Sequence, residues 1–204
     1  MARLMAKVAT AAACLLGLAL APAPLTARAV RAGRAAGQVG RDPLTSSEAD
    51  QLRDTADNPA KRVKLLLDFA ADRLTRFQQT RAGAAPDRQD AMYRLLREYD
   101  GIIAELDDNI DEWMSGHVTG EMSGPPKLEK PLQAMMAAEQ GFIGQLTKIQ
   151  SSSSAADLAT YHFQLSDDLD DTRDSLQGAR ENLADLAKQK QEAEQAKKRK
   201  KHDH

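Results

Sequence analysis

The stretch LATYHFQLSDDLDDTRDSLQGARENLADL, residues 158–186, decides the fold of this 204-residue chain. Its apolar positions alternate spacings of four and three residues, which places them on one face of a helix. A sustained period of 3.5 residues is typical of helices that pack side by side at small crossing angles. We therefore expect a long, coiled-coil-like helix at the C-terminal end. Its predicted seam consists of Leu158, His162, Leu165, Leu169, Thr172, Leu176, Ala179, Leu183 and Leu186.

Three further stretches carry apolar residues at helical spacing. They predict helices over about 59–81, 88–115 and 129–150. The middle one is the most regular, because its main apolar residues lie seven positions apart. These residues are Met92, Tyr99, Leu106 and Trp113.

The connections between these helices predict their directions. The short links 82–87 and 151–154 make the helices on either side of them antiparallel, and 116–126, rich in Gly and Pro, is the one long loop. Only 4% of the residues are aromatic, and few stretches alternate with period two, so no strand is predicted. The expected fold is all-α: an antiparallel up-down-up-down four-helix bundle over 44–187.

A short leading helix is expected over about 46–56. Thr45 and Glu48 form a capping-box pattern, in which each side chain bonds the backbone N–H of the other residue. Asn58 and Pro59 end this helix, and Pro59 suits the first turn of the next one because its missing N–H would be unpaired there.

The first 29 residues have the three parts of a secretory signal peptide. Arg3 and Lys7 form the positive region, and the apolar run 8–20 is too short to cross a bilayer core of roughly 30 Å. Ala27-Arg28-Ala29 places small residues where a signal peptidase reads them. We therefore expect cleavage after Ala29, export to the periplasm or the extracellular space, and a disordered leader over 30–43.

Two alternatives to simple cleavage stay open. The segment could be retained as an anchor, or Cys14 could carry a lipid, although Cys14 lies inside the apolar run and not at its end. Cleavage would leave a chain without cysteine, and therefore without disulfide or thiol chemistry.

Charge is distributed unevenly along the chain. Residues 100–185 contain 17 acidic and 5 basic residues, whereas 188–201 contain 7 basic and 2 acidic. On the helices, several acids point away from the apolar stripes, which predicts acidic outer faces. These acids are Asp108, Asp111, Glu112, Asp167, Asp170, Asp171 and Asp174.

The acid pattern also bears on metal chemistry. Bundles that hold two irons use inward-facing Glu residues and Glu-x-x-His pairs. This sequence has no Glu-x-x-His, and its acids are expected on outer faces, so no buried carboxylate-bridged metal site and no cofactor are predicted. The terminal His202 and His204 are the only weak candidates for binding Zn²⁺ or Ni²⁺.

The basic C-terminal extension, 188–204, is the stretch most suited to bind a partner. Its cations gather in Lys197, Lys198, Arg199, Lys200 and Lys201. Behind a signal peptide, an anionic surface of the cell envelope is the expected counterpart. Nucleic acid is not expected, because no aromatic residues are interleaved for stacking on bases.

No catalytic motif was found: there is no Gly-x-Ser-x-Gly turn and no phosphate-binding glycine loop. We therefore expect a protein that is not an enzyme, most simply a structural or protein-interaction module of the cell envelope. The long helix could pair with a helical partner or with a second copy.

Leu44-Thr45-Ser46-Ser47-Glu48 resembles the Leu-Thr-x-x-Gln motif of small periplasmic helical stress chaperones. The resemblance covers five residues, has Glu where that family has Gln, and lacks a second copy. It implies the alternative function, a periplasmic helical chaperone or metal-stress binding protein.

Overall fold

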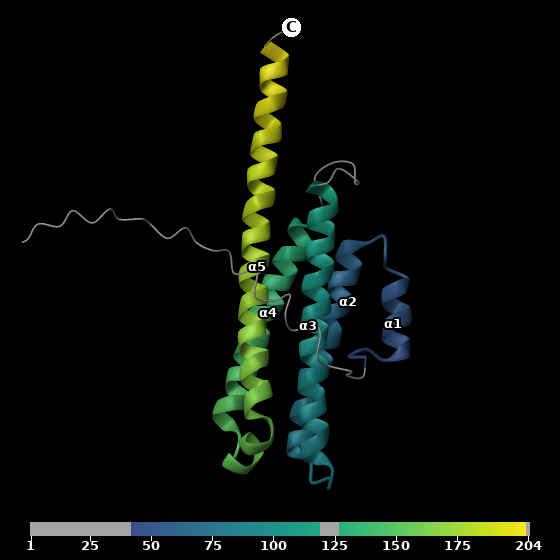
Figure 1. Ribbon diagram of the computed structural model, residues 1–204, viewed down its shortest axis with the longest axis vertical. Coiled ribbons are helices and arrows are strands. Elements are labelled where there is room, and N and C mark those ends of the chain that lie inside the picture. The colour runs from purple at the N-terminus through teal and green to yellow at the C-terminus, as the bar shows by residue number, and fades with distance from the viewer. Residues whose placement is uncertain (1–41, 119–126, 203–204) are drawn as a thin grey trace, which may run out of the picture. The chain divides into compact units, whose positions relative to one another are not determined.

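The computed structural model describes residues 42–118 and 127–202, and the regular structure in these two ranges is entirely α-helical (Figure 1). The all-α class is thus confirmed, and no strand occurs in either range. The predicted signal peptide, the leader up to residue 41 and loop residues 119–126 lie outside the described residues. The helices are α1 (Ser46–Arg53), α2 (Pro59–Ala82), α3 (Arg88–Val118), α4 (Glu129–Ser152) and α5 (Ala155–His202).

The four long helices, α2 to α5, form a helical core. Helices α2 and α3 pack against each other, as do α4 and α5, and each pair is joined by a short connection. The two pairs meet through α3 on α5 and α2 on α4, while α1 lies against α2. In Figure 1, α2 and α4 run in one direction and α3 and α5 in the other. These contacts are consistent with a four-helix bundle.

The predicted apolar stripes supply the buried interior. On α3, every residue of the expected stripe is less than a tenth exposed, from Met92 to Trp113. On α2 and α4, Phe77 and Phe142 are buried and make edge-to-face contacts with Tyr161 and Tyr99, respectively. Aromatic pairs of this geometry add to the stabilisation from apolar burial.

The predicted Thr45–Glu48 capping box is present, and the structure adds Asn58 as a cap of α2 that was not predicted. The Glu48 N–H donates to Thr45 Oγ1 at 3.3 Å, and the Thr45 N–H donates to Glu48 Oε2 at 2.8 Å. Asn58 Oδ1 accepts from the Lys61 N–H at 3.1 Å, with Pro59 in the first turn of α2. These caps satisfy backbone donors that have no partner inside the helix.

The start of α5 differs from the predicted seam. His162 is exposed, whereas the neighbouring Tyr161 is buried and packs on Phe77. The hydroxyl oxygen of Tyr161 lies 2.6 Å from Ser153 Oγ. A large ring that contacts α2 and retains a hydrogen bond displaces the smaller, more polar imidazole from the interior. Phe163 is thereby turned outward and is 84% exposed.

One predicted helix end shifts, and the length of α5 becomes clear. Helix α1 ends at Arg53, because the buried Thr55 bonds the Leu52 carbonyl through both its N–H and its hydroxyl. Helix α5 continues without a break past residue 187, the predicted end of the bundle, to His202. The predicted basic extension is therefore the last part of α5.

Arg73 links α1 to the helical core through hydrogen bonds and ion pairs. It is 1% exposed, and its guanidinium donates to both carboxylate oxygens of Glu48 and to the Pro43 carbonyl. Its Nε lies 2.8 Å from a carboxylate oxygen of Glu98 on α3. We call Arg73, Glu48, Glu98 and the Pro43 carbonyl the Arg73 cluster. Pro43 fits beside α3 because residue 101 is glycine, and a Cβ there would approach the proline Cβ to 2.7 Å.

Candidate functional sites

The sequence-predicted interaction residues lie on the last turns of α5. Of the cations at 197–201, the side chains of Lys198 and Arg199 are described, and both are exposed. His202 is the last residue of α5, and His204 lies outside the described residues. Their predicted metal site therefore stays untested.

The part of α5 that carries these cations extends beyond the other helices of the core (Figure 1). At 1.5 Å per residue, its 48 residues span about 72 Å, whereas the 31 residues of α3 span about 46 Å. Among the described side chains, Lys190 is the last on α5 to form an ion pair with another helix, at 2.5 Å from Glu129. All described side chains from 187 to 199 are exposed. No helix in the described ranges is long and apolar enough to cross a membrane.

A second group of polar residues is buried between α3, α4 and α5. Glu139 and Asp168 are both fully buried, at 0% exposure. We call Asp107, Glu139, Asp168 and the hydroxyl residues around them the carboxyl cluster. The hydroxyl residues are Tyr99, Thr172 and Ser175.

The burial of Asp168 corrects the sequence analysis, which placed the acids of the helices on outer faces. That expectation is right for Asp167, Asp170 and Asp174, which are exposed, but wrong for Asp168. At 100° per residue, Asp168 lies only about 60° from Leu165 on the helix circumference, so the periodicity already places it on the inner face.

Ser175 joins two carboxyl groups. Its Oγ lies 2.5 Å from Glu139 Oε1 and 2.6 Å from Asp107 Oδ1. A serine hydroxyl has one proton and can donate to only one of them. The hydroxyl therefore bridges Asp107 and Glu139 and can satisfy only one of them as a donor at a time.

The surroundings of Asp168 disfavour its charged form. Burial raises its pKa well above the ordinary value of 3.8, and the nearby carboxylates of Asp100, Asp171 and Asp167 raise it further. The hydrogen bond from Gln164 Nε2, at 2.7 Å, opposes this shift only in part. Asp168 Oδ2 has no hydrogen-bond partner, which favours the neutral acid over a buried charge.

Tyr99 completes the cluster. Thr172 donates its hydroxyl proton to the Asp168 carbonyl at 2.6 Å, so the contact of 2.8 Å between Tyr99 and Thr172 is a bond donated by the tyrosine. Burial raises the pKa of Tyr99 well above its ordinary value of 10. The hydrogen bond that Tyr99 donates joins α3 to α5. In the described ranges, no group of three or more His, Cys, Asp or Glu side chains is placed to hold a metal ion.

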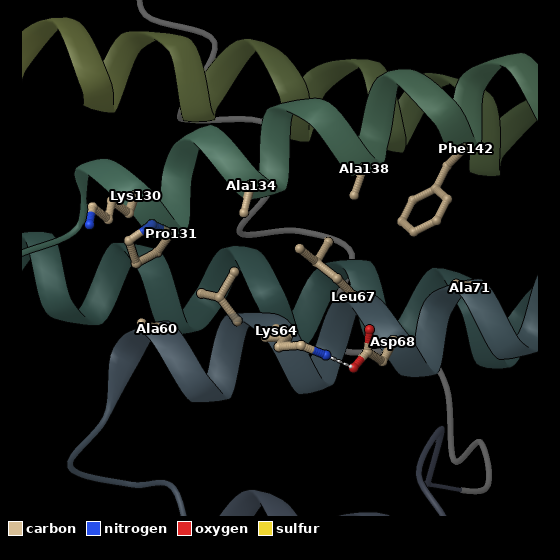
Figure 2. Close-up of a pocket in the computed structure, with 11 residues that line it drawn as sticks. Ala60, Lys64, Leu67, Asp68, Ala71, Lys130, Pro131, Ala134, Ala138 and Phe142 are labelled. Carbon is tan, nitrogen blue, oxygen red and sulfur yellow. Dashed lines mark hydrogen bonds and ion pairs between the residues drawn. The ribbon is translucent and has the colours of Figure 1, made fainter.

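A third feature is a groove of about 510 Å³ between α2 and α4, which Figure 2 shows. Val63, Leu67 and Phe142 give it apolar walls, and small alanines from both helices leave it open. We call it the α2–α4 groove. The sequence analysis missed it, because it depends on which helices become neighbours.

Comparison with known proteins gives no relative from which a function could be carried over. No protein-family model, no curated protein and no solved structure matches the chain. The function is therefore argued from the chain's own residues.

Proposed function

We propose that this chain is an exported, non-catalytic structural or protein-interaction module of the cell envelope. In this proposal α2 to α5 form a four-helix bundle, and the part of α5 beyond residue 186 acts as a docking arm. The observation that carries the proposal is the arm itself: a helical extension whose described side chains are all exposed. A helix that is polar all round gains nothing from packing on its own chain.

The charge of the arm favours an anionic counterpart. The segment 188–201 has seven cations against two acids, and the described members of the terminal group, Lys198 and Arg199, are exposed. Lysines and arginines near an anionic lipid surface each contribute about 1 kcal/mol to binding, and salt weakens this attraction. The counterpart we favour is an anionic surface of the envelope, with a helical protein partner as the alternative.

Export is supported by residues 1–29, which combine a positive start, a short apolar run and Ala27-Arg28-Ala29. Determining the N-terminal residue of the protein recovered from the producing cell would test it. We expect Val30. A chain that keeps Met1 and stays in the cytoplasm would contradict the proposed localisation.

The docking arm is tested by co-sedimentation with vesicles that contain about a third anionic phospholipid. We compare the full chain with a chain ending at Leu186 and with one in which residues 197–201 are all glutamine. Both variants should lose most of their binding at low salt, and the full chain should lose it at high salt. A variant with arginine at each of these positions is the control and should bind like the full chain. If the truncated chain binds the vesicles as well as the full chain does, the proposal that the arm binds an anionic surface is refuted.

A further inference from the structure

The lining of the α2–α4 groove contains few charged side chains. Its only charged lining residues are Lys64, Asp68 and Lys130. Lys64 Nζ pairs with Asp68 Oδ2 at 2.5 Å, so their charges cancel. Among the described residues Lys130 has no ion-pair partner, and its neighbour Glu129 is engaged by Lys190. The groove is thus apolar with one unbalanced positive charge.

That charge lies at one end of the groove. Figure 2 shows Lys130 and Pro131 at the beginning of α4, with Ala134, Ala138 and Phe142 following in order along the same wall. No side chain caps the N-terminus of α4, whose first residue is Glu129. The positive end of the helix dipole therefore lies at the same end of the groove as Lys130, and the acidic Glu129 beside it is paired with Lys190.

The rest of the groove offers only apolar contact. The wall from Lys130 to Phe142 covers thirteen residues, and the twelve steps between them span about 18 Å, close to an extended alkyl chain of roughly fourteen carbons. The volume of about 510 Å³ falls in the range of small-ligand sites. Because Val63 and Leu67 form the opposite wall, a chain lying there would be covered by both helices.

We propose that the α2–α4 groove binds a fatty carboxylate, with the carboxylate at Lys130 and the alkyl chain running past Ala134 and Ala138 to Phe142. One negative charge at the end of an apolar chain matches one positive charge at the end of an apolar groove. The inference is independent of the docking arm on α5, because none of the lining residues belongs to that helix.

The test measures binding of dodecanoate, below its micelle concentration, by calorimetric titration of the full chain. Lys130→Gln should weaken dodecanoate binding at least fivefold, because the charged contact at the carboxylate is lost. The same variant should bind dodecanol, which has the same chain without the charge, as wild type does. Lys127→Gln, which changes an exposed lysine outside the groove lining, is the matched control and should leave both affinities unchanged.

A second variant tests the path of the alkyl chain. Ala134 is exposed within the groove, so Ala134→Trp fills it without disturbing the interior, and it should abolish binding of both ligands while thermal unfolding stays as in wild type. The proposal is overturned if dodecanoate shows no saturable binding, or if Lys130→Gln and Lys127→Gln bind it equally. It is also overturned if the groove instead closes on a second copy, seen as a dimer that Ala134→Trp breaks and dodecanoate does not affect.

Discussion

The Arg73 cluster, where a buried arginine meets the half-buried Glu48, and the carboxyl cluster, where Asp168 is fully buried, treat a carboxyl group in opposite ways. Burial raises the pKa of Glu48, but hydrogen bonds from Arg73 and Thr45 outweigh it and bring the pKa from its ordinary 4.5 to about 2. Burial also raises the pKa of Asp168, and its one hydrogen bond comes from the neutral Gln164, so the pKa stays well above normal. The half-buried Glu48 thus has a cationic partner that favours its charged form, whereas the fully buried Asp168 has only a neutral partner and its charged form is disfavoured.

The two clusters also join different helices. The Arg73 cluster ties the residues around α1 to α2 and α3, and the carboxyl cluster lies between α3, α4 and α5. The first holds an ion pair in which Arg73 has several partners, and the second holds Asp168, whose pKa is raised. We therefore expect the free energy of unfolding to fall at acid pH through Glu48 and to fall towards alkaline pH through Asp168.

The largest effect is expected from Arg73→Met. Removal of the guanidinium leaves Glu48 and Glu98 without their buried cation, and such a loss costs about 3–5 kcal/mol. Urea unfolding at pH 7 would measure it. Arg76→Met is the control, because Arg76 is half exposed and its ion pair with Asp72 is 3.4 Å long, so the change should be under about 0.5 kcal/mol. Similar losses in both variants would mean that Arg73 acts only through packing.

Acid titration should reveal Glu48. Its pKa is lower in the folded protein than in the unfolded chain, so its contribution is complete above pH 4.5 and is lost as pH falls towards 2. The loss amounts to at most about 3 kcal/mol. Glu48→Gln should remove this part of the pH dependence of the unfolding free energy, and it should lower stability at pH 7. If Glu48→Gln leaves the loss of unfolding free energy at acid pH unchanged, another group is responsible for that loss.

Gly101→Ala tests the contact that brings Pro43 to the Arg73 cluster. The new Cβ would lie 2.7 Å from the Pro43 Cβ, so the proline must move and its carbonyl must shift away from Arg73. We expect a loss of about 1–2 kcal/mol. In a Pro43→Gly background the same change should instead stabilise by up to about 1 kcal/mol, because alanine favours helix over glycine. The same sign in both backgrounds would contradict the contact.

The smallest effect is expected from Asp168→Asn, measured as a change in pH dependence. The pKa of Asp168 is higher in the folded protein, so its contribution is complete below pH 3.8 and is lost as pH rises through its folded pKa. Wild type should therefore lose stability towards alkaline pH, and Asp168→Asn should lose less, as measured by the free energy of unfolding between pH 5 and 9. Asp167→Asn, at an exposed neighbour, should leave the slope nearly unchanged.

Much of this molecule is determined by its sequence. The helical stripes, the Thr45–Glu48 and Asn58 caps and the all-α class follow from periodicity and local hydrogen bonding, which need no knowledge of distant residues. The exposed basic stretch at the end of α5 follows from composition in the same way. The helical angle of 100° per residue also places Asp168 on the inner face of α5.

Only the tertiary structure determines which apolar helix faces pack against each other. The choice of Tyr161 over His162 depends on Phe77 of α2, and the Ser175 contacts depend on Asp107 and Glu139 reaching it from two other helices. The α2–α4 groove exists because small residues of two helices far apart in sequence become neighbours. The sequence of one helix records which of its faces is apolar, but the identity of the facing side chains, and with it the pKa of a buried acid, is a property of the packed helices.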